Sequence, residues 1–342
     1  MANRSRDEAR ARTVRASALA HLTLAVVWSM KSRILLGAIA AITAANLHAQ
    51  SLEATAISGV IAPNTQIQLI GENFKGTEGP VALPDGTVLF TQAQINEVTR
   101  IASDGSVSSF VEKSNGANGL GFNGQGELVA VETSPSGIGV IYPADQARVL
   151  VDKYQDTPLN RPNDLVVAKS GAIYFTDPGP RPEPGQPRSK TAVYQVSPKG
   201  DVNLIASDIE RPNGIQLSPD DKVLYVANTL GEYVIAFDIG KDGQVSNRRN
   251  FAKLAGFKDT DLGPASGADG LAVDSKGRLY VATSAGVEVF DNKGTALGVV
   301  SLPKQPQNLA FAGKDKKTLY VVGRGSVYSI PTLAHGPTTR AK

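Results

Sequence analysis

The chain has 342 residues, no cysteine and a formal net charge of +3, and residues 1–49 hold seven of its 35 basic but two of its 32 acidic residues. The positive excess therefore lies in the first 49 residues, and we expect neither a broad basic face nor a nucleic-acid partner. The absence of cysteine excludes thiol nucleophiles, disulfides and thiolate-bound zinc or iron–sulfur clusters. The three histidines, His21, His48 and His335, lie near the two ends, which argues against a Ser-His-Asp triad or a histidine general base.

Residues 1–49 have the pattern of a leader with a signal peptide. Met30 begins a short charged stretch, residues 34–45 are apolar, and small residues precede Gln50. We expect cleavage before Gln50, a true start at Met30, and a periplasmic or secreted protein with no stable membrane insertion after cleavage. The alternative is that residues 18–30 form a retained anchor, but 13 residues are short for a bilayer.

Short apolar runs of four to seven residues, rich in Val, Ile, Leu, Tyr and Phe, fill the chain after the leader. Glycine, proline, Asn-Gly and Asp-Gly separate them, which indicates strands and turns of an all-β protein. Six units open with a strand, a turn and a second strand, at 80–92, 119–132, 164–177, 214–228, 270–283 and 309–322. Third strands are expected near 97–101, 139–143, 192–196, 233–237, 286–290 and 326–330, and fourth strands near 107–111, 148–152, 202–206, 250–254 and 297–301.

The sixth unit lacks a fourth strand, whereas residues 50–73, before the first unit, contain a strand-like run without a partner. This predicts a six-bladed β-propeller over 74–332, closed by the N-terminal strand and followed by a tail, 333–342. A solenoid would not need the missing strand from the other end of the chain. The proline-rich stretch 178–187 and the stretch 256–268 are expected to be long connections.

The residue before each first strand carries a side-chain oxygen; the six are Glu78, Asn118, Asn163, Asn213, Asp269 and Asn308. First strands line the channel of a propeller, so these residues are expected to converge at one mouth. The alternative is that each is an ordinary turn residue, as Asn-Gly and Asp-Gly often are. Two facing carboxylates repel unless a cation lies between them. We expect one divalent cation, Ca²⁺ first and Mg²⁺ second because only oxygen ligands are offered, with Mn²⁺ and Zn²⁺ as further alternatives.

Several stretches resemble the SMP-30/gluconolactonase/luciferin-regenerating-enzyme family, across roughly residues 74–332 of the chain. They are TEGP (77–80), RPNDL (161–165) with IYFTDP (173–178), RPNGI (211–215), GADGLAVD (267–274) and PQNLAFAG (306–313). The resemblance implies a six-bladed propeller, a divalent cation in the channel, usually Ca²⁺, and hydrolysis of lactones. The stretch 132–139 departs from the family, since many members carry a histidine or an arginine-rich segment there, and this bears on the substrate rather than the metal.

By motif, Glu78, Asn213 and Asp269 match the family's metal ligands, and Asp269 also matches the proposed proton donor and acceptor. Asn163 matches an asparagine that is either a fourth ligand or a substrate contact, and Arg161 matches an arginine that holds the substrate in some members.

Two further residues are expected to bind substrate, Asn118 from its place in the ring and Asp164 as the second carboxylate available for proton transfer. Asn308 completes the ring but is left out of the site. The predicted function is an exported, metal-dependent hydrolase that opens small, sugar-type lactones by attack of water on a carbonyl polarised by the cation. The alternative is a non-catalytic propeller that binds a ligand or protein and uses the cation structurally.

Overall fold

The computed structural model describes residues 52–181, 189–261, 263–339 and 342. The leader lies outside the described residues, as do the predicted cleavage site, the start at Met30 and part of the proline-rich stretch. Ala49–Lys342 forms one compact unit. Among the described residues, no helix has the length and apolar character needed to span a bilayer.

The first three sheets, which we call blades 1–3, each contain four antiparallel strands in chain order. Blade 1 consists of β3 (Thr77–Ala82), β4 (Val88–Gln92), β5 (Glu97–Ile101) and β6 (Val107–Glu112). Blade 2 consists of β7 (Leu120–Phe122), β8 (Leu128–Thr133), β9 (Ser136–Tyr142) and β10 (Arg148–Val151). Blade 3 consists of β13 (Leu165–Val167), β14 (Ile173–Asp177), β15 (Ala192–Val196) and β16 (Val202–Ala206).

Blades 4 and 5 repeat this arrangement, and blade 6 contains strands from both ends of the chain. Blade 4 consists of β17 (Pro212–Leu217), β18 (Val223–Asn228), β19 (Tyr233–Ile239) and β20 (Val245–Lys253). Blade 5 consists of β21 (Leu271–Val273), β22 (Leu279–Thr283), β23 (Gly286–Phe290) and β24 (Ala296–Val300). Blade 6 has the order β1 (Leu52–Glu53), β2 (Gln66–Glu72), β27 (Ser326–Pro331), β26 (Thr318–Gly323) and β25 (Asn308–Ala312).

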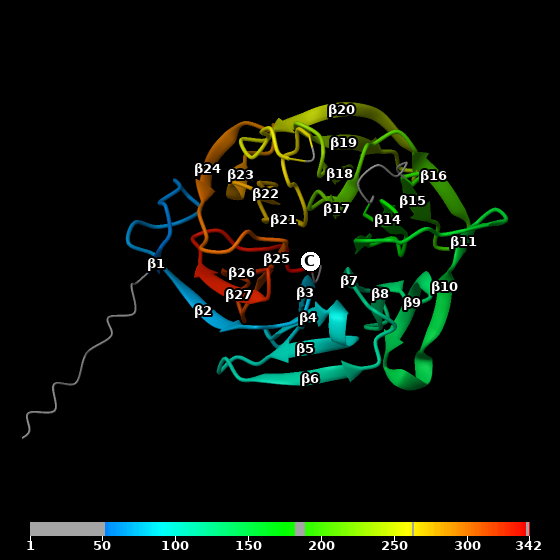
Figure 1. The fold of residues 1–342 in the computed structure, drawn as a ribbon, viewed down its shortest axis with the longest axis horizontal. Helices are drawn as coiled ribbons and strands as arrows, with labels where there is room; N and C mark the ends of the chain where they lie inside the picture. The colour runs from blue at the N-terminus through cyan, green and yellow to red at the C-terminus, as the bar shows by residue number, and fades with distance from the viewer. Residues whose placement is uncertain (1–51, 182–188, 262, 340–341) are drawn as a thin grey trace, which may run out of the picture. The chain divides into compact units, whose positions relative to one another are not determined.

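The six blades form a β-propeller, as the repeats predict. The first strands contact one another in the order β3, β7, β13, β17, β21 and β25, and β25 returns to β3, so that these strands surround the channel (Figure 1). All residues of β3, β17 and β25 are buried, whereas four of the six residues of the outer strand β6 are exposed. Strands that are covered on both faces need not alternate apolar and polar residues as half-exposed strands do.

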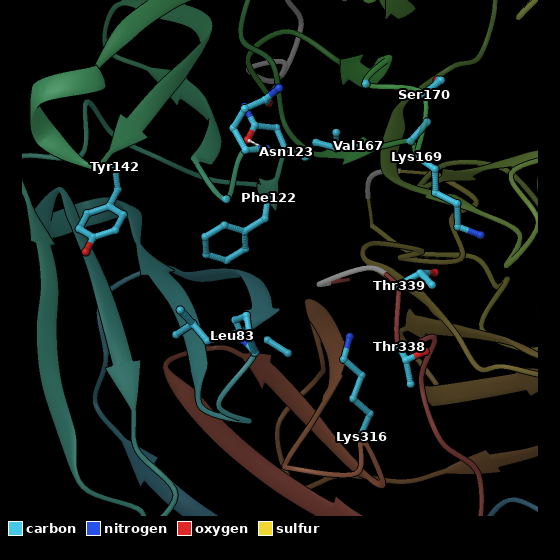
Figure 2. Close-up of a pocket in the computed structure, with 17 residues that line it drawn as sticks. Leu83, Phe122, Asn123, Tyr142, Val167, Lys169, Ser170, Lys316, Thr338 and Thr339 are labelled. Carbon is cyan, nitrogen blue, oxygen red and sulfur yellow. Dashed lines mark hydrogen bonds between the residues drawn. The ribbon is translucent and has the colours of Figure 1, made fainter.

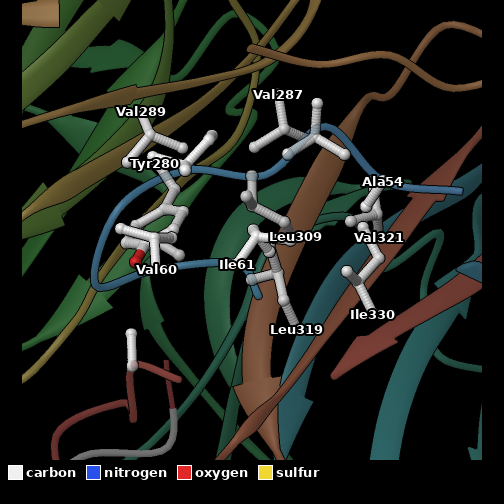
Figure 3. Close-up of a cluster of buried hydrophobic side chains, with 14 of the residues drawn as sticks. Ala54, Val60, Ile61, Tyr280, Val287, Val289, Leu309, Leu319, Val321 and Ile330 are labelled. Atoms are coloured by element: carbon white, nitrogen blue, oxygen red, sulfur yellow. The ribbon is translucent and has the colours of Figure 1, made fainter. Parts of the chain in front are cut away.

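The segment before blade 1 is integrated into blade 6. β2 pairs antiparallel with β27, with Gln68 opposite Ser329, and β1 pairs with β2. Val60 and Ile61, which precede β2, are buried against side chains of blades 5 and 6, including Tyr280 (Figure 3). Burial of an isoleucine stabilises a fold by about 1.5–3 kcal/mol, so this segment contributes to the core.

The sequence analysis did not predict the shortest elements, because two or three residues are too few to show an alternation of apolar and polar residues. They are the hairpin β11 (Lys153–Tyr154) and β12 (Thr157–Pro158), the strand β1, and the 3₁₀ turns η1 (Ala93–Ile95) and η2 (Ala144–Gln146). The described part of the tail packs closely on the blades. Leu333 N donates to Val60 O at 2.8 Å, and Ser275 Oγ lies 3.0 Å from His335 Nε2.

Candidate active site

A cavity of about 780 Å³ lies at the end of the channel where the first strands begin. Its lining includes six of the seven residues predicted for the site: Glu78, Arg161, Asn118, Asn163, Asn213 and Asp269. A second cavity, of about 610 Å³, lies among the turns that follow the first strands, beside Leu83, Phe122 and Lys169 (Figure 2). None of the seven residues lines this second cavity, so the chemistry is concentrated at one end of the channel.

Three oxygens in the larger cavity are buried and accept no hydrogen bond: Asn163 Oδ1, Asn213 Oδ1 and Asp269 Oδ1. In the described part of the chain only two other side-chain atoms share this condition, Arg100 Nε and Ser326 Oγ. A buried polar atom without a partner costs about 1–3 kcal/mol, and native structures contain few of them. Three in one cavity therefore indicate that these oxygens are arranged to bind a ligand.

The donor set suits a hard divalent cation. The described residues include no group of three His, Cys, Asp or Glu side chains that could hold a metal. The candidate donors here are two carboxylates and two asparagine amides. Glu78 and Asp269 supply two negative charges, and Asn163 and Asn213 supply neutral oxygens. Oxygen-only ligands of this kind favour Ca²⁺ or Mg²⁺ over Zn²⁺.

Glu78 lies at the start of β3 and is 7% exposed. Its Oε2 accepts hydrogen bonds from Asn308 Nδ2 at 3.1 Å and from Gly79 N at 3.3 Å, and Gln307 Nε2 lies 3.4 Å from Oε1. Burial raises the pKa of Glu78 to about 7; the negative charge of Asp164 adds to the rise, while the bond from Asn308 opposes it. Asn308, which the sequence prediction left out of the site, thus positions a predicted ligand.

Asp269 precedes β21. Burial raises its pKa well above the usual range, and the negative charges of Glu78 and Asp164 raise it further. The positive charges of Arg324 and Arg211 act in the opposite direction. The carboxylates of this channel therefore disfavour one another's ionisation, and a divalent cation between Glu78 and Asp269 would relieve the repulsion.

Two threonine hydroxyls, from Thr176 in β14 and from Thr229 just after β18, hold Asn213. Thr229 Oγ1 donates to Ala268 O at 2.8 Å and must therefore accept from Asn213 Nδ2, which lies 3.1 Å away. This fixes the amide so that Asn213 Oδ1 faces the cavity. One blade earlier, Thr176 Oγ1 donates to Asn213 O at 2.6 Å.

The glycines that follow Asn213 and Asp269 permit close approach of the first strands. A Cβ atom on Gly214 would overlap the carbonyl oxygen of Asp269, and one on Gly270 would overlap Asn308 Oδ1. Neither glycine has a positive φ. The alternative of ordinary turn dipeptides is therefore wrong at these two positions, where crowding around the channel requires a residue without a side chain.

Asp164 occupies the position that glycine holds after Asn213. Its side chain is 1% exposed, and both carboxylate oxygens lie 2.5 Å from Lys342 Nζ, which is itself buried. Figure 1 places the C-terminus at the centre of the ring. Asp164 does not line the larger cavity, so the structure does not bring this predicted substrate contact to the others.

Three arginines outside the predicted site line the same cavity: Arg181, Arg211 and Arg324. Arg211 could have been predicted from the sequence, because it begins the same Arg-Pro-Asn tripeptide as Arg161. Arg181 follows β14 and Arg324 lies between β26 and β27, and no motif marks either of them.

The family comparison agrees with this geometry. The family described as the SMP-30/Gluconolactonase/LRE-like region matches residues 76–324, most of the propeller. The chain belongs to this family. The resemblance read from the motifs is confirmed, and the matched region includes every residue of the cavity named above.

Individual relatives of this SMP-30/gluconolactonase family member are similar along most of their length. A gluconolactonase from Zymomonas mobilis is 29% identical over 306 residues, covering 82% of this chain and 85% of the relative. Human regucalcin is 28% identical over 250 residues, covering 70% and 77%. The solved structure of a gluconolactonase from Xanthomonas campestris has a TM-score of 0.71 at 28% identity and covers 83% of this chain and 96% of that one.

Proposed function

We propose that this protein hydrolyses small, sugar-type lactones with the help of one divalent cation, Ca²⁺ first. Three buried oxygens without hydrogen-bond partners, from Asn163, Asn213 and Asp269, carry the proposal. Similarity to gluconolactonases over most of both chains supports the reaction class. Glu78, Asn163, Asn213 and Asp269 would hold the cation, which would supply a Lewis acid for the lactone carbonyl.

Other roles in the reaction, namely proton transfer, substrate binding and positioning, fall to different residues in and around the cavity. Asp269, with one oxygen free of hydrogen bonds, accepts the proton of the attacking water and returns it to the leaving ring oxygen. Arg161 and Asn118 line the cavity and hold the substrate. Asn308 and Gln307 act through Glu78 and are positioning residues.

Two further proposals concern the ends of the chain. We propose that β2 closes the ring, which its pairing with β27 supports. We also propose that residues 1–49 direct export to the periplasm or beyond, as their signal-peptide pattern suggests.

Turnover of D-glucono-1,5-lactone, measured before and after chelation, tests the function. We expect chelation to abolish hydrolysis, added Ca²⁺ to restore it, and Asp269→Asn to lower kcat by at least about 10²-fold without unfolding the protein. Gln125→Glu, on the turn beside the other cavity, is the control and should keep full activity. Comparing activity in periplasmic and cytoplasmic fractions of cells that express the full chain tests export in the same experiment.

The non-catalytic alternative predicts a different pattern. A protein that binds Ca²⁺ by calorimetry, and gains thermal stability from it, but hydrolyses no lactone would have a structural cation. Full activity in Asp269→Asn would contradict the assigned proton transfer.

A further inference from the structure

The arginines in the described part of the chain fall into two groups by location. Nine lie in the described part of the chain, and four of them line the larger cavity: Arg161, Arg181, Arg211 and Arg324. The other five each form an ion pair with a carboxylate at 2.5–2.8 Å; they are Arg100, Arg148, Arg248, Arg249 and Arg278. Three of the cavity's arginines, Arg161, Arg181 and Arg324, differ from these five in their partners as well as in their place.

No carboxylate of the described residues pairs with Arg161, Arg181 or Arg324. The guanidinium of Arg324 donates to the neutral Gln305 Oε1 at 3.3 Å. Arg161 uses its main-chain N–H, not its side chain, to bind Asp177 Oδ1 at 2.8 Å. Both residues are exposed, so their charged groups are accessible to a ligand in the cavity.

Their positions in the fold place positive charge on two sides of the cavity. Arg161 and Arg211 each stand two residues before an asparagine whose oxygen lacks a partner, and the proline between them restricts the backbone. Arg181 follows β14 in blade 3. Arg324 comes from blade 6, three blades away around the ring.

The carboxylates of the cavity do not balance this charge. Its lining contains two acidic residues, Glu78 and Asp269, which are the proposed ligands of a divalent cation. A bound divalent cation would offset these two carboxylate charges, and the guanidinium groups of Arg161, Arg181 and Arg324 would remain without a carboxylate partner. A neutral sugar lactone does not compensate such a surplus, whereas a carboxylate or phosphate matches the fork of an arginine and is attracted by the field.

We propose that the preferred substrate is a sugar lactone that carries an anionic group, a carboxylate or a phosphate ester, away from the reacting carbonyl. Arg161 and Arg324 attract that group from the two sides of the cavity. This inference rests on the proposed lactonase function. Water adds across the ring ester to give the hydroxy acid, and the anionic group is unchanged by the reaction.

Matched lactones test the proposal with the Ca²⁺-loaded protein. D-Glucaro-1,4-lactone and D-glucono-1,4-lactone differ in a carboxylate, and 6-phospho-D-glucono-1,5-lactone and D-glucono-1,5-lactone differ in a phosphate. We expect kcat/KM to favour at least one anionic member by roughly tenfold or more, and salt to reduce the preference. The larger of the two preferences identifies the anionic group.

Variants connect the preference to the cavity. Arg161→Gln and Arg324→Gln should each reduce the anionic-to-neutral ratio of kcat/KM by roughly tenfold. Arg249→Gln removes an arginine that is ion-paired to Asp238 outside the cavity, and should leave the ratio unchanged.

The outcomes separate this proposal from the proposed function. Cation-dependent hydrolysis with equal or better turnover of the neutral lactones overturns the anionic preference and leaves the lactonase intact. If no lactone is hydrolysed, the lactonase proposal fails, and calorimetric titration with D-glucarate and D-gluconate decides the anionic preference. Tighter binding of D-glucarate that is lost in Arg324→Gln supports it, and equal or absent binding overturns it.

Discussion

Among single residues, Glu78 shows that burial changes the pKa of a side chain more than its neighbours in sequence do. A carboxyl group that would ordinarily be ionised far below neutrality has its pKa raised to about 7 at the start of a fully buried strand. Hydrogen bonds from Asn308 and Gly79 lower the pKa of Glu78, but by less than burial raises it. Without a cation the ionised form is costly, and this couples metal binding to pH.

The raised pKa predicts how stability depends on pH in the chelated protein. The folded state holds the Glu78 proton up to about pH 7, whereas the unfolded chain loses it near 4.5. The stabilisation is therefore complete below about pH 4.5 and disappears as the pH rises through 7, a loss on the order of 3 kcal/mol. We expect the Tm of the chelated protein to fall over this interval, and excess Ca²⁺ to oppose the fall. Glu78→Gln should weaken the dependence; an identical slope in this variant would refute the assignment.

Among the elements, the first strands are shaped by their convergence on the channel. Gly270, just before β21, lies against Asn308 at the start of β25, and the overlap that a Cβ atom would make there leaves no room for a methyl group. Gly124, by comparison, lies in the turn between β7 and β8, where an added Cβ would meet no atom within 4 Å.

These two glycines provide a matched pair of substitutions. Gly270→Ala should destabilise the protein by about 1–3 kcal/mol or more, because the added carbon meets backbone as well as side chain. Gly124→Ala should be neutral or slightly stabilising, because alanine lowers the conformational entropy of the unfolded chain and causes no clash in the folded one. Urea unfolding midpoints compare the two, and a wild-type midpoint in Gly270→Ala would contradict the crowding.

In the molecule as a whole, one sheet combines strands from both ends of the described chain. β2 supplies Ile67, 6% exposed, to the core of blades 5 and 6, whereas Leu69 on the same strand is 53% exposed. If β2 closes the propeller, its inward contacts should stabilise every blade and not only the sixth, because opening one junction exposes the edges of two blades.

Truncation of these two side chains tests the closure. Ile67→Ala should lower the free energy of unfolding by about 2–5 kcal/mol in a single transition, and Leu69→Ala should change it by less than about 0.5 kcal/mol. Calorimetry measures both. A separate early transition in Ile67→Ala, with the main transition unmoved, would mean that β2 is an appendage to the ring.

The repeating architecture and most of the residues around the cavity could be predicted from local sequence patterns. Short apolar runs predict the strands, and glycines mark the turns between them. These patterns recur in six similar units because each unit buries its inner strands in the same way. Glu78, Asn163, Asn213 and Asp269 could be predicted because each stands at the same place in its unit. Asp164 could not be placed correctly, since its buried partner, Lys342, lies 178 residues away in the chain.

Which side chains share the cavity, and in what state of charge, depends on the folded ring. Arg181 and Arg324 lie in connections without a motif, and they reach the site because the ring brings blades 3 and 6 to one channel. The raised pKa values of Glu78 and Asp269 likewise depend on burial and on charges distant in sequence. Local patterns specify strands and turns, but desolvation and Coulomb interactions depend on distances in space, which the closed ring alone fixes.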